Sequence, residues 1–380
     1  MTRRAFLPLV VALAVVVALH AQAPPTSLQA AAIEKVDALA EAEYAKDPVG
    51  GLTVGIVGGR QLAWTKSYGF ADAENRKPAT RETAYRIGSI TKQFTATMML
   101  QLVEQGKIHL TDPLEKYFPE IKQVPRPTPD APAITLLQMA SMTSGLAREP
   151  TGPADHSIGP VSGWEQKVLA ALPHTAYAYE PGTRYLYSNI GYASLGIALS
   201  RAAHEPYTSY VEQYVLAPLG MTHTAFEPTP AIRDRMARGY TVPRGKEPEW
   251  STAEAEKAGR GYRVPNGALI STVDDLARWI VFELGDGPAG VLKKETQDEL
   301  YARAYSANGK LASGYGIALA LTRRGDLVAM GHGGSTAGFL SEAIFDRESK
   351  TGVIVLRNVT GGKLNPGDLA LRALEIAAKR

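Results

Sequence analysis

Strand-like sequence stands at both ends of this chain, and helix-like sequence fills the stretch between them. Residues 52–57 and 61–69 are β-rich and flank a Gly-Gly pair, which predicts a hairpin near the N-terminus. Further strand-like runs come late in the chain, at residues 315–321, 327–330, 339–345 and 352–356. Residues 91–260 carry helical patterns and proline-rich loops instead. We therefore expect the two ends to share one antiparallel sheet, into which the helical stretch is inserted.

This arrangement predicts an α/β fold made of two domains. An α/β domain, with an antiparallel sheet flanked by helices, would comprise residues 24–90 and 261–380. Residues 91–260 would form an inserted, mainly helical (all-α) domain. Amphipathic patterns predict helices near the two ends of the chain, at residues 28–46 and 369–378. A groove between two such domains is the expected place for a small-molecule site.

The first 23 residues have the character of a secretory signal peptide. Arg3 and Arg4 precede an apolar run from Phe6 to Leu19, and Ala21-Gln22-Ala23 fits a cleavage site. The apolar run is shorter than the roughly 20 residues that cross a bilayer. The absence of cysteine disfavours a lipid anchor. We expect a periplasmic or secreted protein with no stable membrane anchor after cleavage.

Charge and composition disfavour several functions. Without the two leader arginines, 39 basic residues face 38 acidic ones, and no basic stripe predicts nucleic-acid binding. No cysteine is available as a disulfide partner, a thiolate ligand or a nucleophile. The seven histidines show no metal-binding spacing. A hydrolase without a metal or another cofactor is therefore the simpler expectation.

Ser89 and Lys92 are the first candidate catalytic pair. They form the chain's single Ser-x-x-Lys pattern, at the start of an apolar helical run that Gly106 should end. Residues three apart share a helix face, so the amine can reach the hydroxyl. A serine needs such a proton acceptor to become a useful nucleophile. Taken alone, the pattern is more often a helix cap beside a solvated lysine.

Tyr187 and Asn189 form the second pattern, the chain's one Tyr-x-Asn. A Pro-Gly pair precedes them and an apolar, small-residue run follows. These neighbours predict a short connection that leads into a buried helix. An isolated pair of this kind is more often a packed tyrosine and an asparagine that satisfies a turn.

The third pattern is His332-Gly333-Gly334-Ser335, between two β-rich runs. Glycines at the edge of a strand would let a substrate backbone bind as an additional strand. A glycine-rich hairpin turn with a structural histidine is the alternative. The order and the long separations of the three patterns make each more informative than it is alone.

Together these patterns resemble the serine β-lactamase and penicillin-binding protein superfamily. The similar branch contains class C β-lactamases, D,D-carboxypeptidases, D-aminopeptidases and related esterases. Tyr187-x-Asn189 stands where class A members have Ser-Asp-Asn, and His332-Gly333-Gly334 stands where they have Lys-Thr-Gly. Other stretches that look like this branch are residues 135–137, 143–146, 218–224 and 271–277. The resemblance runs from about residue 36 to the C-terminus.

The resemblance implies that Ser89 attacks a carbonyl group and forms an acyl-enzyme. The backbone N–H groups of Ser89 and Ser335 would form the oxyanion hole, and Asn189 would offer its amide to the substrate. The sequence leaves two candidates for the general base. The first is a Tyr187 phenolate, which needs roughly 4 kcal/mol of stabilisation that a Lys92 cation about 4 Å away would supply. The second is a desolvated, neutral Lys92 with Tyr187 as proton relay, which needs a pKa shift of similar size at Lys92.

His332 and Gly333 bear on specificity. A Lys-Thr pair there would offer a cation and a hydroxyl to the carboxylate of a β-lactam, whereas histidine is mostly neutral at pH 7 and glycine has no side chain. We therefore favour a carboxylesterase or a D-amino-acid-specific peptidase over a class C-like β-lactamase. The expected partners are small ester, amide or peptide substrates, with peptidoglycan stem peptides as one candidate.

Two further alternatives concern the class of protein. The first is a slow acyl acceptor that binds penicillin-like ligands or peptidoglycan without efficient turnover. The combination of Ser89, Lys92 and Tyr187 speaks against it, because binding alone does not need a nucleophile and a base together. The second alternative, an α/β-hydrolase, is disfavoured because no Gly-x-Ser-x-Gly occurs.

Overall fold

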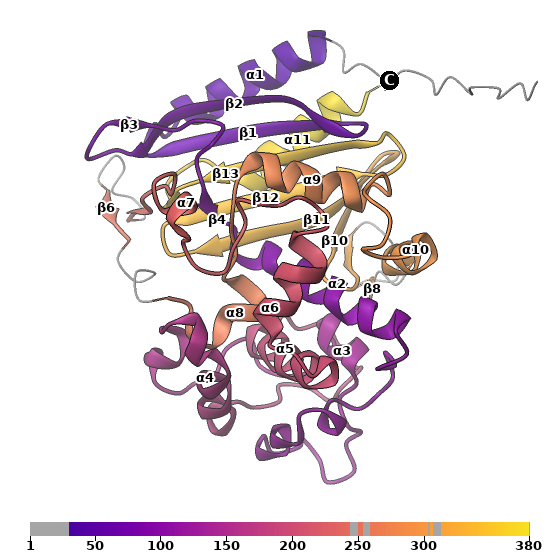
Figure 1. The fold of residues 1–380 in the computed structure, drawn as a ribbon. Coiled ribbons are helices and arrows are strands. Elements are labelled where there is room, and N and C mark those ends of the chain that lie inside the picture. The colour runs from indigo at the N-terminus through magenta and orange to yellow at the C-terminus, as the bar shows by residue number, and fades with distance from the viewer. Residues whose placement is uncertain (1–29, 244–249, 254–258, 303–304, 307–312, 380) are drawn as a thin grey trace, which may run out of the picture.

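A nine-stranded antiparallel sheet crosses the molecule, and the first hairpin of the chain lies beside its last strands in this sheet (Figure 1). The computed structural model describes residues 30–243, 250–253, 259–302, 305–306 and 313–379. The strand order is β3-β2-β1-β13-β12-β11-β10-β9-β8. The bounds are β1 Gly51–Gly58, β2 Gln61–Asp72, β3 Lys77–Pro78, β8 Tyr305–Ser306, β9 Ser313–Tyr315, β10 Ala320–Arg324, β11 Leu327–Thr336, β12 Phe339–Asp346 and β13 Thr351–Arg357.

The two ends of the chain meet at the β1–β13 pair, where Val54 lies opposite Val355. The expectation of a shared antiparallel sheet is confirmed. Two small sheets accompany the large one. They pair β4 Tyr85–Arg86 with β7 Ile270–Ser271, and β5 Tyr240–Val242 with both β6 Ser251–Thr252 and β14 Val359–Gly361.

Helices cover both faces of the large sheet. Helices α1 (Ala30–Ala45) and α11 (Pro366–Ala377) cover one face, and α9 (Val273–Glu283) lies on the other (Figure 1). Alternation along β13 explains this: Val353 and Val355 pack toward α1 and α11, while Ile354 and Leu356 join the core on the α9 side. A strand buried on both faces therefore reads as one apolar run, which is how residues 352–356 appear in the sequence.

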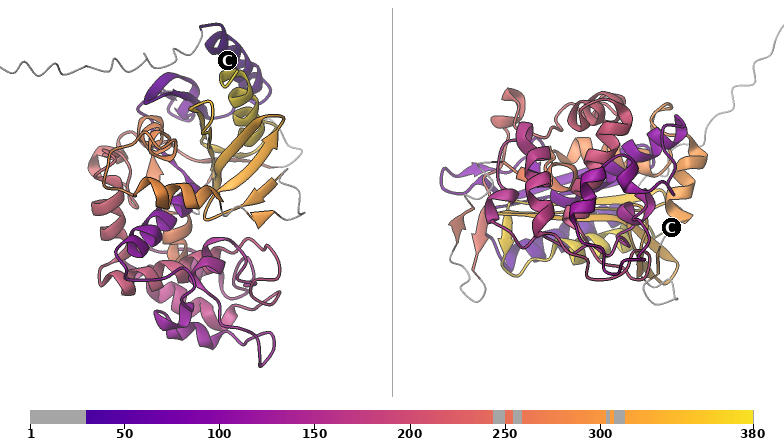
Figure 2. Two further views of the ribbon diagram at one scale, coloured as in Figure 1. Left: turned by 90° about the vertical axis from the view of Figure 1, so that its right-hand side faces the viewer. Right: turned by 90° about the horizontal axis from the view of Figure 1, so that it is seen from below.

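Six of the described helices form a second layer on the α9 side, below the sheet in Figure 1 and in the left view of Figure 2. They are α2 Thr91–Glu104, α3 Leu136–Ala140, α4 Trp164–Ala171, α5 Asn189–Ala203, α6 Tyr207–Val211 and α8 Val264–Gly267. The helices α7 Pro230–Arg233 and α10 Lys294–Ala302 lie to the two sides of the sheet in Figure 1. Short 3₁₀ segments lie at Gly88–Ile90, Leu114–Lys116, Pro119–Gln123, Ala154–Ser157, Val161–Gly163, Leu172–His174 and Gly261–Arg263, and a π turn at Glu212–Leu216.

Helix α2 is the central helix of this layer. Every residue from Thr91 to Leu102 is buried, polar side chains included. Gly106 has φ +67°, and its N–H donates to the carbonyl of Val103. The predicted glycine stop of this helix is confirmed, since a left-handed residue is the usual way to close a helix.

One strand prediction is wrong. Residues 315–321 do not form a single strand, because β9 ends at Tyr315 and β10 begins at Ala320. Between them Gly316 N–H donates to the carbonyl of Leu319, and Ala318 has φ +57°. The N–H of Ala318 donates to the carbonyl of Ala140 in the helical layer. This long-range contact bends a segment whose local sequence favours an extended conformation.

The predicted leader, residues 1–23, lies outside the described residues. Within the part of the chain that is described, no helix has both the length and the apolar character needed to span a bilayer. The division into domains at residues 24–90, 91–260 and 261–380 stays a proposal. Strand β5 falls inside the second of these ranges and pairs with β14 in the third.

Candidate active site

Ser89 lies in the 3₁₀ turn Gly88–Ile90, which runs directly into α2. Its side chain is partly exposed, while Gly88 and Ile90 are buried. Gly88 has φ +50°, and a Cβ on it would lie 2.8 Å from the backbone nitrogen of Ser335. Strand β11 and the Ser89 turn are therefore in close contact.

Gly334 explains how β11 comes so near this turn. A Cβ at Gly334 would collide with the carbonyl oxygen of Ile87 and with Oγ of Ser341. Ser341 is the cross-strand partner of Gly334, and its hydroxyl donates to the Ile87 carbonyl over 2.9 Å. The sequence predicted room for a substrate backbone here. The structure shows that at Gly334 the space is taken by the protein's own backbone.

Lys92 is completely buried, and its Nζ has three hydrogen-bond partners. They are Oγ of Ser89 at 3.1 Å, Oδ1 of Asn189 at 2.9 Å and the carbonyl oxygen of Asn266 at 2.9 Å. The last two can only accept hydrogen bonds, so they take two N–H groups of the amine. A neutral amine has two N–H groups and one lone pair, and the lone pair then faces Ser89. Burial holds the pKa of Lys92 well below its usual value, which shifts it toward this neutral form.

Asn189 is the first residue of α5 and uses both ends of its amide inside the protein. Its Oδ1 accepts from Lys92 and from Nδ2 of Asn266 at 3.0 Å, and its own Nδ2 donates to Glu149 at 2.5 Å. The cavity in front of Ser89 is lined by other residues. The geometry gives Asn189 contacts that hold Lys92, where the sequence predicted contacts with substrate.

Tyr187 stands across from Lys92, just before α5. Nζ of Lys92 lies 4.8 Å from the centroid of its ring, and the Arg148 guanidinium lies 4.7 Å from it. Burial nevertheless raises the pKa of the Tyr187 phenol above its usual value, although a hydrogen bond with Ser89 opposes the rise. The phenol is therefore protonated at neutral pH and can pass a proton on.

His332 is buried on β11 and engages both ring nitrogens. Its Nδ1 lies 2.5 Å from the carbonyl oxygen of Gly333, and its Nε2 lies 3.0 Å from the hydroxyl of Tyr315. A carbonyl only accepts, so Nδ1 carries the proton and Nε2 accepts from Tyr315. Burial and the nearby Lys92 lower the pKa of His332 to about 3. The ring is neutral, as the sequence predicted.

A cavity of about 640 Å³ opens in front of Ser89. Strand β10 pairs with β11 only as far as Gly331, so beyond this point β11 has an edge that no described strand covers. Ser89, Tyr187 and the residues of this edge line the cavity together with residues 361–367, which run from the end of β14 into the first turn of α11. The three sequence patterns thus come together at one place, and His332, Gly333, Gly334 and Ser335 form its edge.

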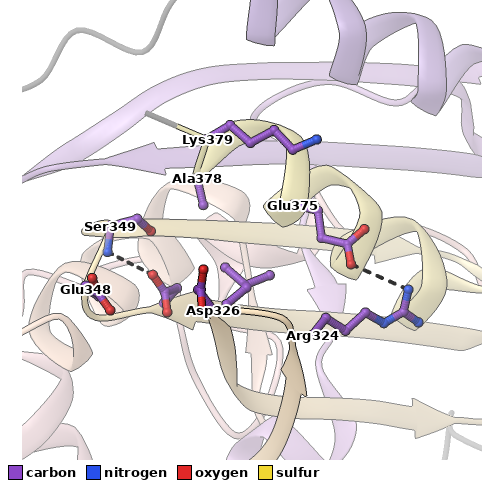
Figure 3. A pocket seen from close by; sticks show the side chains of 9 residues that line it. Arg324, Asp326, Glu348, Ser349, Glu375, Ala378 and Lys379 are labelled. Carbon is purple, nitrogen blue, oxygen red and sulfur yellow. Dashed lines mark hydrogen bonds and ion pairs between the residues drawn. The ribbon is translucent and has the colours of Figure 1, made fainter.

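A second cavity, of about 550 Å³, lies at the other end of β11 (Figure 3). Arg324 and Glu375 form an ion pair of 3.5 Å across it, and Asp326, Glu348 and Ser349 lie around it. It shares no lining residue with the Ser89 cavity. The candidate active site is therefore the cavity at Ser89.

Sequence reasoning missed four residues of the site. Asn266 and Glu149 anchor the Lys92 network, Tyr315 orients His332, and Glu342 lines the cavity. Glu149 also accepts hydrogen bonds from the Tyr262 hydroxyl and, at 3.2 Å, from Arg263. Glu149 follows shortly after the family-like stretch 143–146, which is the one signal that could have pointed to it.

The antiparallel sheet with its helical layer, and the serine turn held against the edge of that sheet, define a β-lactamase-like protein. Residues 36–378 match the family described as Beta-lactamase. The chain belongs to this family of serine hydrolases, within the serine β-lactamase and penicillin-binding protein superfamily, and the resemblance predicted from its motifs is confirmed.

Two curated relatives illustrate the similarity. Protein flp of Staphylococcus aureus (strain COL) is 26% identical over 326 residues, which cover 86% of this chain and 63% of flp. The D-alanyl-D-alanine-carboxypeptidase/endopeptidase AmpH of Escherichia coli (strain K12) is 32% identical over 263 residues, 69% of this chain and 64% of AmpH. The match thus spans less than two thirds of the length of either relative.

Among solved structures, the octameric penicillin-binding protein homologue from Pyrococcus abyssi has a similar fold. It superposes with a TM-score of 0.77 at 25% identity, and the match covers 90% of this chain and 77% of that chain. The predicted β-lactamase-like fold is therefore confirmed.

Proposed function

We propose that this protein is a serine hydrolase that works through an acyl-enzyme on Ser89, with Lys92 as general base and Tyr187 as proton relay. The observation that carries the proposal is the buried Lys92 amine, whose two other partners are acceptors and whose third position faces Ser89 Oγ at 3.1 Å. An amine in this position can remove the hydroxyl proton as the serine attacks.

In acylation, Ser89 Oγ would bond to the carbonyl carbon of the substrate while its proton moves to Nζ of Lys92. The bond from that carbon to the leaving group breaks, and the leaving group receives the proton through the hydroxyl of Tyr187. Water then attacks the new ester, releases the acid and restores Ser89. The raised pKa of Tyr187 and the lowered pKa of Lys92 support this division of roles over a Tyr187 phenolate.

The backbone N–H groups of Ser89 and Ser335 would bind the developing oxyanion. The close approach of Ser335 N to Gly88 supports this pairing. Removal of one such donor typically costs about 2.7–4 kcal/mol of barrier. The substrate backbone would lie along the uncovered edge of β11, beside His332, Gly333 and Gly334.

The neutral His332 supports a substrate without an anchoring carboxylate. We favour a carboxylesterase or a D-amino-acid-specific peptidase over a β-lactamase. AmpH is named as a D-alanyl-D-alanine-carboxypeptidase/endopeptidase, which adds peptidoglycan stem peptides as candidate substrates. The leader-like residues 1–23 support export to the periplasm or the medium, where such peptides occur.

The test is a panel of p-nitrophenyl esters, nitrocefin and D-Ala-D-Ala peptides on the purified protein and on Ser89→Ala. We expect a burst, steady turnover of an ester or peptide, and a covalent adduct by mass spectrometry that Ser89→Ala lacks. Ser162→Ala, at an exposed serine outside the cavity, is the matched control. An adduct on Ser89→Ala at the wild-type rate would refute the proposal, and a stoichiometric burst without turnover would indicate a slow binding protein.

A further inference from the structure

Glu342 places a carboxyl group directly over Gly333 in the candidate active site. The two residues are cross-strand partners on β12 and β11. A Cβ on Gly333 would lie 2.6 Å from Oε2 of Glu342. The carboxyl therefore fills the space that a side chain at position 333 would occupy.

The Glu342 carboxyl lines the same cavity as Ser89. It is partly buried, and among the described residues neither a hydrogen bond nor an ion pair to it is found. Burial raises its pKa to about 7. A partly buried carboxylate whose pKa is raised and that has no partner lowers the stability of the folded state when it is charged, which makes a structural role a poor explanation for Glu342.

The charged groups around Glu342 leave it free to meet a ligand. On α11, Asp368 pairs with Arg372 at 3.4 Å, and on β11 the neutral His332 hydrogen-bonds to Tyr315. Arg148 lies over the ring of Tyr187.

Lys363 also lines the cavity, in the loop before α11, and forms no ion pair with Glu342. The residue opposite Glu342 on β13 is the apolar Val355.

We propose that Glu342 is a specificity-determining residue, which binds a positively charged group of the substrate above Gly333 and repels a carboxylate there. The inference rests on the proposed acyl transfer at Ser89. The corresponding Lys-Thr pair of the similar class A enzymes would offer a cation and a hydroxyl to a carboxylate, so the sign of recognition is reversed in this chain. The substrate class is an ester or amide that carries an ammonium group.

Three p-nitrophenyl esters test the proposal, with acyl chains of equal length that end in a trimethylammonium group, its tert-butyl isostere or a carboxylate. At pH 8 we expect Glu342→Gln to lower kcat/KM about tenfold for the cationic ester and to raise it several-fold for the anionic one. The neutral ester should change less than about twofold. Glu212→Gln is the matched control, because burial also raises the pKa of Glu212 but its side chain lies on the π turn outside the cavity.

The pH dependence gives an independent readout. Below about pH 7 the Glu342 carboxyl gains a proton, so the preference for the cationic over the neutral ester should fade between pH 8 and pH 6. Dividing kcat/KM for the cationic ester by kcat/KM for the neutral ester cancels the effect of the Lys92 and Tyr187 titrations, because it is the same for both esters. In Glu342→Gln the ratio should stay flat across this range.

Thermal unfolding separates specificity from structure. The folded state holds the Glu342 proton more tightly than the unfolded chain, so the charged carboxyl lowers stability as pH rises from about 4.5 through about 7. Glu342→Gln should therefore unfold at the same or a higher temperature than the wild type at pH 8. A residue with a structural role would give a lower unfolding temperature.

Equal cation-to-neutral ratios for the wild type and Glu342→Gln at pH 8 would overturn the inference. Equilibrium binding of the same three esters to Ser89→Ala measures the charge preference without turnover. A binding preference that Glu342→Gln removes would support the role of Glu342 even if Ser89 forms no acyl-enzyme. Failure of the proposed function would instead appear as absence of turnover and labelling with all three esters.

Discussion

Nδ2 of Asn189 donates a hydrogen bond to the Glu149 carboxylate over 2.5 Å, and this contact determines which end of the amide faces Lys92. A carboxylate can only accept, so the amide nitrogen must point toward it. Oδ1 is then left to accept from Lys92, which leaves the lone pair of a neutral amine for Ser89. Glu149 thus acts on Ser89 indirectly, through Asn189 and Lys92.

Glu149→Gln should weaken this orientation, because glutamine can also donate and allows Asn189 to flip. We expect kcat for ester hydrolysis to fall about tenfold with KM little changed. The charge of Glu149 raises the pKa of Lys92, so its removal should also move the acidic limb of the pH–rate profile to lower pH. Glu165→Gln on α4 is the control. If the acidic limb of the pH–rate profile does not shift in Glu149→Gln, a positioning role for Glu149 is contradicted.

Lys92→Met and Tyr187→Phe should each slow acyl-enzyme formation at least about a hundredfold, measured by stopped-flow burst kinetics. If neutral Lys92 is the base, activity rises as pH passes upward through its lowered pKa. Tyr187→Phe should keep this limb and Lys92→Met should lose it. Tyr185→Phe, a half-exposed neighbour, is the matched control. Loss of the limb in Tyr187→Phe alone would assign the base to the phenol instead.

Gly334→Ala should force β11 away from the Ser89 turn, because the new methyl group meets the carbonyl oxygen of Ile87. Displacement of Ser335 N from the oxyanion site should lower kcat about a hundredfold or more. Overpacking should cost about 1–3 kcal/mol in the free energy of unfolding. Gly163→Ala, where nothing lies within 4 Å of the new Cβ, should change neither quantity. Wild-type activity of Gly334→Ala would show that the contact with Ile87 is dispensable.

Arg357 and Asp47 form a buried ion pair of 2.7 Å that ties β13 to the segment before β1. The Arg357 side chain has no exposed surface, so Asp47→Ala would leave an uncompensated buried charge. We expect a loss of about 3–5 kcal/mol in the free energy of unfolding by urea. Lys294→Ala breaks the exposed pair with Asp298 and should cost less than about 0.5 kcal/mol. A loss below about 1 kcal/mol for Asp47→Ala would mean that water or a rearranged partner compensates Arg357.

The sequence was informative wherever the evidence was local. The spacing of Ser89 and Lys92 predicted their contact because helix geometry alone places residues three apart on one face. The strand runs near Val54 and Val355 predicted strands of one sheet because alternation and apolar content are properties of short segments.

Motif letters without context do not locate the edge of the candidate active site. Lys350-Thr351-Gly352 spells Lys-Thr-Gly, yet it lies at the β12–β13 turn, where Lys350 Nζ forms an ion pair of 3.1 Å with Asp286. The corresponding edge of the active-site cavity is formed by His332 and Gly333 instead. Position in the sheet, which the letters of a motif do not contain, decides which side chains can reach Ser89.

The linear chain was sufficient to establish the superfamily, the sheet built from both ends and the three segments that carry Ser89, Lys92, Tyr187 and His332. It could not give the partners of Asn189, the ring nitrogen of His332 that carries the proton, or the position of the Glu342 carboxyl over Gly333. Those features depend on contacts between residues that are close in space but distant in sequence, and on the desolvation that burial imposes. The conformational propensity of a short segment depends on neither, so these three features can be identified only in the folded structure.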